Sequence, residues 1–505
     1  MKLLTSQMRK SKTFSGGYRF INFEGQPKDT LEEVRVPLRV TIPLRQGFGA
    51  EGDCLVKAGE GVLAGQIIGH SEYGVSSPVH SSINGVVEEV KRVNYFKRDC
   101  LMVSIKGDGN PRYQKLPGAI NNWESLATDE IEKIVYLSGV TALDREGIPT
   151  RMRSSIILPK EAKSLIVHGV GSEPYNVSPE LLLKGKNILN LIEGIKILRK
   201  IMPNARVFLA LSSHSRKILE EIEKLTSAYD WLEIYPLEPK YPQGYDEMLV
   251  PTILKQKFPY GYSAANVGAV ILNLQAVLLS YEAVVEGKPL IERTIALCGP
   301  AFKEPSHIKA RIGTPLREVV EGRVKEGLSA RFVLNGLLTG FELKDLNLPI
   351  DKTYSQIIGL VENRERKFLS FLNPGLKSDS YSNTFMAKLF PRIKKTCDTN
   401  KHGEERPCIS CNYCEEVCPV GIIPHLLVKY IQCNILDETL MNLRVFNCIE
   451  CGLCSYVCPS KIPLAKQIRE GQEKLTIQGC DRNQCILPYF DNLKGIEEYR
   501  GPKEL

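Results

Sequence analysis

The chain has 505 residues, of which 43% are hydrophobic and 25% charged, and its formal net charge is +8. These proportions are typical of a soluble globular protein, and the length predicts three or four domains. The charge is modest for this length, and no stripe of Lys and Arg interleaved with aromatic residues is present, which argues against nucleic-acid binding. Because the N-terminal residues lack the apolar run of a signal peptide, the fifteen cysteines indicate a reducing compartment and a cytoplasmic location.

The first 115 residues are predicted to form β-structure. Residues 34–43 alternate between apolar and polar side chains, and Gly and Pro then recur at the spacing of tight turns. Residues 56–69 and 77–87 resemble two hairpins of the barrel-sandwich hybrid found in biotinyl and lipoyl carrier domains. Those carriers present a lysine at the tip of the second hairpin, and residues 76–85 contain none. The region is therefore predicted to be a docking or structural module without biotin or lipoate.

Residues 118–290 alternate between strand and helix patterns. Two short apolar runs, at 164–167 and 205–211, have the length of strands, and residues 181–201 between them have the period of a helix. This alternation predicts an α/β domain with a mostly parallel sheet. The uncharged segment 264–281 is long enough to raise the question of a membrane span, but its polar residues favour a buried helix. No transmembrane helix is predicted.

Two further regions precede the cysteine-rich part. Residues 291–345 resemble a small β-grasp module of the soluble-ligand-binding type. Residues 346–405 have weaker periodicity, several turn signals and a basic stretch at 388–395. They are predicted to be a connector that lays the C-terminal domain against the α/β domain.

One cysteine pattern, C-x2-C-x2-C-x3-C-P, is written twice within residues 406–475. In this pattern the first three cysteines bind one 4Fe–4S cluster and the fourth binds the cluster of the other copy. The predicted ligands of the first cluster are Cys408, Cys411, Cys414 and Cys458, and those of the second are Cys418, Cys448, Cys451 and Cys454. Structural zinc and disulfides are the alternatives. Zinc takes four ligands from paired C-x2-C knuckles, and eight cysteines in two identical runs exceed that need. The pattern therefore predicts an electron-transfer protein.

Four cysteines after residue 345 lie outside the double motif: Cys397, Cys433, Cys480 and Cys485. We interpret them as ordinary thiols. A metal or redox pair that faces a partner is the alternative for Cys480 and Cys485, which have a C-x4-C spacing within the C-terminal tail, residues 476–505.

The order of these regions, together with the second cysteine motif and the residues that follow it, resembles the C subunit of the Rnf ion-translocating electron-transport complex. The likeness covers nearly the whole chain and includes residues 42–50, 172–175, 240–244 and 287–293. Other segments resemble the A subunit of the sodium-translocating NADH:quinone reductase (Nqr), which normally lacks the iron–sulfur ligands: residues 138–143, 362–365, 373–378 and 423–427. The sequence is intermediate between the two subunits.

The resemblance implies that the α/β domain is a Rossmann-like domain, similar to the NADH-binding subunit of complex I, with FMN as cofactor and NADH as substrate. The residues that would contact them are Gly139, Glu173, Tyr241, Gly244 and Asn273. The family's glycine-rich loop is replaced here by residues 137–145, and Gly171 stands at the first of two acidic positions. Because phosphate is bound best by backbone N–H groups that no side chain obstructs, these differences predict a weakened flavin site.

The resemblance also implies a peripheral subunit of an Rnf- or Nqr-type ion-translocating complex on the cytoplasmic face of the inner membrane. The subunit would relay electrons through two 4Fe–4S clusters between a soluble donor, on the NADH or ferredoxin side, and membrane subunits or quinone. The implied activity is that of an NADH:quinone or NADH:ferredoxin oxidoreductase. Two alternatives stay open: a soluble flavin/iron–sulfur reductase similar to the cobalamin reductases, and a non-catalytic adaptor that relays electrons.

Overall fold

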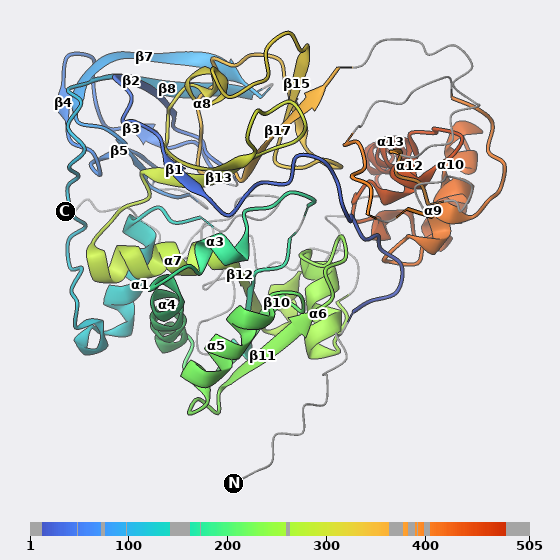
Figure 1. Ribbon diagram of the computed structural model, residues 1–505, viewed down its shortest axis with the longest axis horizontal. Coiled ribbons are helices and arrows are strands. Elements are labelled where there is room, and N and C mark those ends of the chain that lie inside the picture. Colours follow the sequence, from blue (N-terminus) through green and yellow to red (C-terminus); the bar gives the residue numbers. More distant parts are fainter. Residues whose placement is uncertain are drawn as a thin grey trace.

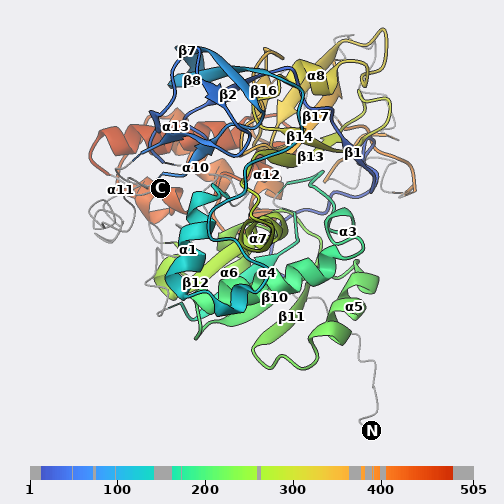
Figure 2. The ribbon, with the colours of Figure 1, turned by 90° about the vertical axis from the view of Figure 1, so that its left-hand side faces the viewer.

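The structure is a computed structural model that describes residues 13–47, 49–71, 76–96, 98–141, 162–171, 173–258, 263–362, 377–381, 389–390, 392–397 and 405–480. Two bodies rich in β-strands lie above an α/β domain, and a helical domain lies to one side of both (Figure 1). In the view turned by 90°, the α/β domain again lies beneath the two β-rich bodies (Figure 2).

The N-terminal module consists of two small sheets around one core. The first sheet has the order β2 (Arg39–Pro43), β8 (Arg98–Gly107), β7 (Gly85–Tyr95) and β4 (Gly61–Val62), and the second has the order β3 (Asp53–Cys54), β5 (Ile67–His70) and β6 (Val79–His80). All pairings within the two sheets are antiparallel. Val40, Ile42, Val103 and Ile105 alternate with more polar neighbours and are fully buried in the core. This arrangement is the predicted barrel-sandwich hybrid.

The first described residues belong to other parts of the molecule. Strand β1 (Leu31–Glu33) pairs in parallel with a strand of the β-grasp sheet. Upstream of it, Tyr18 pairs with Tyr241 of the α/β domain, and the N–H of Gly17 donates to the carbonyl of Val417 in the helical domain (2.8 Å). The predicted N-terminal module of residues 1–115 therefore begins, as a compact unit, after β1. Residues 13–25 instead connect the α/β and helical domains.

The α/β domain has a four-stranded parallel sheet with the order β11-β10-β9-β12. Its elements in chain order are η1 (Trp123–Ser125), α1 (Thr128–Leu137), β9 (Ser164–His168), α3 (Pro179–Leu182), α4 (Asn187–Ile201), β10 (Arg206–Ser212), α5 (Arg216–Thr226), β11 (Leu232–Leu237), α6 (Asp246–Leu254), η3 (Ala264–Val267), β12 (Ala269–Asn273), α7 (Leu274–Tyr281) and η4 (Glu282–Glu286). In β9, Leu165 and Val167 face α1, α4 and α7, whereas Ile166 faces α6. In the sheet, β10 lies on one side of β9 and β12 lies on its other side.

The predicted buried helix over residues 264–281 is wrong, because this segment is a 3-10 turn, a strand and a helix. Asn273 ends the strand, and its side-chain oxygen accepts a hydrogen bond from the N–H of Ala276 (2.9 Å), which caps helix α7.

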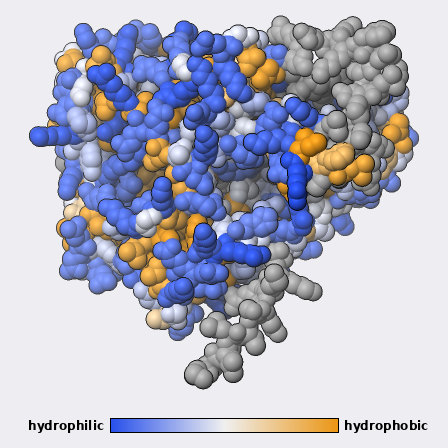
Figure 3. All heavy atoms as spheres, in the orientation of Figure 1, coloured by the Kyte–Doolittle hydropathy of each residue, from blue (hydrophilic) through white to orange (hydrophobic). Residues whose placement is uncertain are grey.

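No helix in the described part of the chain is long and apolar enough to cross a membrane. Figure 3 shows hydrophilic side chains over most of one face, with apolar side chains interspersed.

The β-grasp sheet has the order β1-β14-β13-β17-β15-β16. Its other elements are β13 (Glu292–Cys298), β14 (Ser306–Arg311), α8 (Leu316–Val320), β15 (Ala330–Leu334), β16 (Phe341–Leu343) and β17 (Gln356–Val361). Leu316, Val319 and Val320 of α8 pack into the core of this sheet. Strand β17 lies in the range predicted as a connector, so the β-grasp unit extends past residue 345 to Val361.

A buried lysine fixes the barrel-sandwich module to the β-grasp unit. Lys352 is 1% exposed, and its ammonium group donates to the hydroxyl of Ser77 (3.0 Å) and to the carbonyl of Pro78. These two residues immediately precede β6, in the hairpin that carries the attachment lysine in the carrier domains. Here the hairpin instead receives a lysine from another domain, which holds it in place.

The C-terminal domain is built from one unit repeated at an offset of forty residues. Helices α9 (Tyr413–Glu416) and α10 (Pro424–Gln432) correspond to α12 (Leu453–Val457) and α13 (Leu464–Ile477), and α11 (Glu438–Asn442) and η7 (Val445–Asn447) join the two copies. Leu427 of α10 and Ile468 of α13 are fully buried in a shared core. The duplicated cysteine motif is therefore also duplicated in three dimensions.

Candidate functional site

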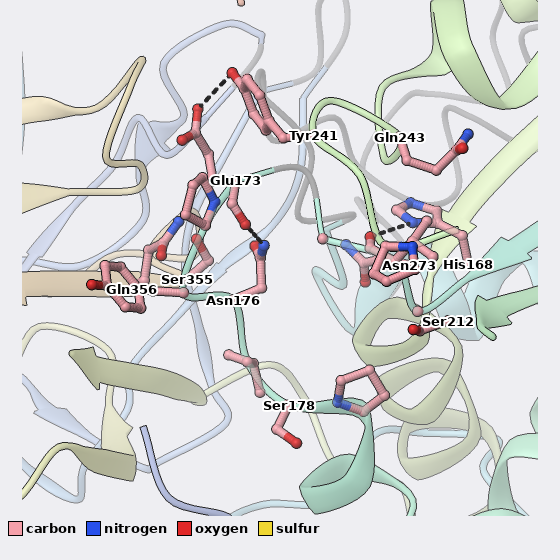
Figure 4. A pocket seen from close by; sticks show the side chains of 18 of the residues that line it. His168, Glu173, Asn176, Ser178, Ser212, Tyr241, Gln243, Asn273, Ser355 and Gln356 are labelled. Carbon is pink, nitrogen blue, oxygen red and sulfur yellow. Dashed lines mark hydrogen bonds between the residues drawn. The ribbon is translucent and has the colours of Figure 1, made fainter. Parts of the chain in front are cut away.

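A cavity of about 810 Å³ lies at the carboxyl ends of the parallel strands. His168, Ser212 and Asn273, which end β9, β10 and β12, line one side of it (Figure 4). Thr339 and Ser355 of the β-grasp unit line another side, and the cysteine-rich domain also contributes to the lining. The cavity opens where the chain crosses from one side of β9 to the other, which is where ligands of open α/β sheets bind.

The N-terminus of helix α7 points into this cavity, since Asn273, Leu274 and Gln275 all line it. The free N–H groups and the dipole of a helix N-terminus favour an anion such as a phosphate. The cavity volume falls in the range of sites for cofactor-sized ligands. The described residues therefore fit a flavin mononucleotide.

Glu173 is the acidic group at the centre of the site. Its carboxylate accepts hydrogen bonds from the hydroxyl of Thr339 and from the N–H of Leu338 (3.2 Å), both in the β-grasp unit. The hydroxyl of Tyr241 lies 3.3 Å from the same carboxylate (Figure 4). Glu173 thus ties the β-grasp unit to the α/β domain and is held in one orientation.

Tyr241 joins the cavity to the cysteine-rich domain. Its hydroxyl lies 2.6 Å from the carbonyl oxygen of Cys451 and 3.0 Å from the hydroxyl of Tyr245. Burial raises the pKa of Tyr241 well above its usual value, and the nearby Glu173 raises it further. The phenol is therefore a neutral hydrogen-bond donor at physiological pH.

The structure brings three of the predicted contact residues together, because Glu173, Tyr241 and Asn273 all line the cavity. Gly244 follows the lining residue Gln243 in the same turn. Gly139 is not part of the lining. It follows helix α1 with a φ of +70°, and a Cβ there would lie 2.7 Å from the carbonyl of Pro78 and 2.8 Å from the ammonium of Lys352. Its small size is used for packing against the barrel-sandwich hairpin.

Gly171, at the position where the family has its first acidic residue, lines the cavity. A Cβ there would lie 2.2 Å from the side-chain nitrogen of Asn176, whose amide donates to the carbonyl of Glu173. A side chain at residue 171 would require Asn176 to move. Residues 142–145 of the predicted flavin loop lie outside the described residues.

Sequence reasoning missed several residues of the site. His168, Asn176 and Ser212 line the cavity, and Thr339 binds Glu173 from another domain. Their position at the carboxyl end of a strand was the available signal for His168 and Ser212. Nothing in the local sequence indicates that Thr339 lies beside Glu173.

The two cysteine loops have the same backbone conformation. In the first, Ser410 and Asn412 have φ values of +54° and +61°, and in the second the equivalent Glu450 and Gly452 have +54° and +76°. In both loops the N–H two residues after the first cysteine lies 3.4 Å from its sulfur. Left-handed residues at matching positions curl each loop so that backbone N–H groups face the sulfurs, which favours thiolate ligands.

The thiols form two groups. Burial raises the pKa of Cys414 to about 11, and the thiols that raise it further are those of Cys411, Cys458 and Cys408. Burial also raises the pKa of Cys454 well above its usual value, with further contributions from Cys448, Cys451, Cys418 and Cys414. Cys414 thus interacts with the other two thiols of its own loop and with Cys458, and Cys454 interacts with the other two of its own loop, with Cys418 and also with Cys414. The interactions with Cys458 and Cys418 are those that the predicted crossed ligation requires. Bound iron would hold all of them as thiolates.

No group of His, Cys, Asp or Glu side chains within the described ranges is arranged to hold a single metal ion. A tetrahedral zinc would need four ligands within ~2.0–2.3 Å of one point. A cube of four irons and four sulfides holds its cysteines farther apart than a single zinc ion does.

The cysteines outside the motif have different surroundings. Cys397 is buried and packs with Cys298 and Tyr175, and burial raises the pKa of Cys298 well above its usual value. Cys433 is exposed, and Cys480 is half-buried against the core of the helical domain. Cys485 lies outside the described residues, so the alternative of a Cys480–Cys485 pair stays a prediction.

Gly16 brings the N-terminal segment against the end of the first cysteine motif. Its φ is +69°, and a Cβ there would lie 2.6 Å from the carbonyl oxygen of Cys418. We expect Gly16→Ala to cost about 1–3 kcal/mol and to lower the temperature at which the iron–sulfur absorption bleaches. Gly185→Ala is the matched control, since Gly185 has a φ of +63° and open space around it. Equal effects of the two changes would show that the contact with Cys418 contributes nothing.

Three domain families match the chain. The RnfC barrel sandwich hybrid domain matches residues 12–110, the Nuo51 FMN-binding domain matches residues 135–279, and the 4Fe-4S dicluster domain matches residues 407–462. These matches confirm three of the predicted fold classes and their order: the barrel-sandwich hybrid, the flavin-type α/β domain and the dicluster domain. They also confirm the predicted cofactor classes, with FMN in the α/β domain and 4Fe–4S clusters in the C-terminal domain.

Several relatives match most of the chain. The C subunit of a proton-translocating ferredoxin:NAD(+) oxidoreductase complex from Clostridium ljungdahlii is 27% identical over 82% of this chain and 84% of that protein. The C subunit of a Na(+)-translocating ferredoxin:NAD(+) oxidoreductase complex from Acetobacterium woodii is 27% identical over 86% of this chain and 90% of that protein. The C subunit of an ion-translocating oxidoreductase complex from Pectobacterium carotovorum subsp. carotovorum is 26% identical, and the match covers 96% of this chain but only 60% of that protein.

Among solved structures, an NAD+-reducing NiFe hydrogenase in the H2-reduced state has a chain that is 12% identical to this one, with a TM-score of 0.42. The match covers 74% of this chain and 65% of that chain.

Proposed function

This chain belongs to the family of Rnf complex C subunits, and from that premise we propose that it relays electrons between NADH bound at its cavity and a partner at its iron–sulfur domain. The observation that carries the proposal is the shared wall between the cavity and the second cysteine loop. Glu450 lines the cavity, and the next residue, Cys451, accepts the hydrogen bond of Tyr241. A ligand in the cavity therefore lies beside a cluster ligand.

The proposed electron transfer uses two kinds of cofactor, FMN in the cavity and the iron–sulfur clusters in the C-terminal domain. When bound, FMN exchanges a hydride with a nicotinamide and single electrons with iron–sulfur centres. The chain supplies the helix α7 N-terminus for its phosphate, and Glu173 and Tyr241 on the side of the cysteine loop. Because the family's glycine-rich loop is replaced, we expect the chain to lose FMN readily during purification and to regain it when FMN is added.

The two cysteine groups differ in exposure, which suggests a direction for the electrons. Cys448, Cys451 and Cys454 are buried, and their loop forms part of the cavity wall. Cys408 is exposed, and the adjacent Ile409 is 67% exposed. We propose that electrons enter at the group that includes Cys451 and leave at the group that includes Cys408.

The partners follow from the relatives, whose names describe subunits of ion-translocating complexes, two of them with ferredoxin and NAD(+). We propose that this chain binds membrane subunits of such a complex on the cytoplasmic face of the membrane. Ferredoxin, directly or through another subunit, is the proposed electron partner, and a quinone-linked route of the Nqr type is the alternative.

Anaerobic reconstitution tests the proposal on one sample. We expect about eight irons per chain, binding of added FMN, and bleaching of the iron–sulfur absorption by NADH only when FMN is present. Asn273→Ala should weaken FMN binding, because it removes the cap of helix α7 at the cavity. Cys433→Ser changes an exposed cysteine outside the motif and should behave like the wild type.

Three results would contradict parts of the proposal. A colourless, zinc-loaded chain would exclude the iron–sulfur function. Clusters without any FMN binding would favour the non-catalytic adaptor. A fully active chain that does not co-purify with membrane subunits would favour the soluble reductase.

A further inference from the structure

Tyr241 has a place in the molecule that the electron-relay function alone does not explain. It follows β11, its backbone exchanges two hydrogen bonds with Tyr18 (both 2.9 Å), and its side chain is 5% exposed. The backbone of Tyr241 is thus fixed, and its ring is buried. Its hydroxyl is directed to the carbonyl of Cys451, to Tyr245 and to Glu173.

The single proton of the phenol has one preferred acceptor among these groups. Glu173 already receives hydrogen bonds from Thr339 and from the N–H of Leu338. Tyr245 has a hydroxyl of its own that can donate to Tyr241. The carbonyl of Cys451 is the nearest acceptor, at 2.6 Å. The hydroxyl dipole therefore points its positive end at the backbone of a predicted cluster ligand.

Such a dipole changes the reduction potential of a cluster. Reduction adds a negative charge to the cluster, and donors aimed at its ligands stabilise that charge. The effect is strong here because Tyr241 and Cys451 are both buried, so water does not screen it. The carboxylate of Glu173 on the other side of the hydroxyl has the opposite effect, since a nearby negative charge opposes reduction.

We propose that Tyr241 is a positioning residue that raises the potential of the cluster held by Cys418, Cys448, Cys451 and Cys454, and that Glu173 offsets it. Both residues line the cavity. A ligand that draws either side chain toward itself would change the balance, so the potential of this cluster is linked to occupancy of the cavity. The inference rests on the proposed function, because it requires that the two clusters are present.

The test is an anaerobic redox titration of the full, cluster-loaded chain without added flavin, followed by EPR. The signal of the cluster in question is the one that Cys451→Ala removes. At the wild-type midpoint of this cluster, Tyr241→Phe should lower the ratio of reduced to oxidised cluster by up to about tenfold, which is the upper end of the effect of one hydrogen bond between neutral groups. Glu173→Gln should raise the same ratio. The other cluster should titrate as in the wild type in both variants.

Tyr235→Phe is the matched control. Tyr235 is also buried, and its hydroxyl also donates to a backbone carbonyl, that of Thr252 (2.8 Å), but it is not a lining residue of the cavity. This control should leave both potentials unchanged. Unchanged potentials in Tyr241→Phe and Glu173→Gln, or equal shifts of both clusters, would overturn the inference while the electron-relay function stands. A wild-type chain without two clusters would instead refute the proposed function itself.

Discussion

Replacing Cys414 by alanine should remove one 4Fe–4S cluster, and replacing Cys418 should remove the other, although the two cysteines are four residues apart. The thiol of Cys414 interacts with those of Cys408, Cys411 and Cys458. Cys418 interacts with Cys454, as Cys414 also does, but it is not among the thiols that act on Cys414. The turn that follows α9 carries the chain from one group to the other, so neighbours in sequence are ligands of different clusters.

Each variant should retain about four irons in place of about eight, and EPR of the reduced proteins should show loss of a different signal in each. Cys433→Ala is the control, because Cys433 is exposed and lies outside both groups. If both variants perturb the same signal, the crossed ligation is wrong and each motif holds its own cluster. The measurement needs no assumption about FMN or NADH.

The cluster domain was the easiest part to predict, because the spacing of the cysteines dictates the chemistry locally. The loops could be aligned residue by residue, and the left-handed residues Ser410 and Glu450 recur at the same motif position. The α/β domain was predictable in type, since apolar runs of strand length alternate with a helical period. Its second half was not, because residues 264–281 are largely apolar and periodicity cannot separate a buried strand from a buried helix. Only Asn273, as a helix cap, marks the boundary.

The candidate site was predicted in part. Glu173, Tyr241 and Asn273 were named from the resemblance, and all three line one cavity. Gly139 was named on the same grounds and lies against Lys352 instead. Contacts between domains decide this outcome: Thr339, Tyr18 and Cys451 come from three distant parts of the sequence, and no local pattern shows that they meet. Strand pairing across long separations, as between β1 and β14, escapes prediction for the same reason.

Lys352 should make the protein less stable as the pH falls from about 10 to about 7. Burial lowers its pKa to about 7, and the nearby Arg293 lowers it further, whereas a lysine in an unfolded chain titrates near ~10.4. Between these values the unfolded chain binds a proton that the folded chain does not, so the free energy of unfolding decreases by up to ~1.4 kcal/mol per pH unit as the pH falls. The buried His80, Arg293 and Asp351 are the other charged or titratable groups around Lys352.

Lys352→Met removes this gradient, and its cost should therefore depend on pH. The change leaves Ser77 and Pro78 without the donor that they have in the wild type, which costs ~1–3 kcal/mol at any pH. At pH 9.5 the variant should be less stable than the wild type. At pH 7 the difference in the free energy of unfolding should shrink by about 3 kcal/mol or reverse, because the wild type loses stability as the pH falls and the variant does not. Denaturant unfolding under anaerobic conditions at pH 7, 8 and 9.5 measures the difference, with Lys133→Met on the exposed face of α1 as the control. A difference between wild type and Lys352→Met that stays constant with pH would mean that Lys352 keeps its proton in the folded protein.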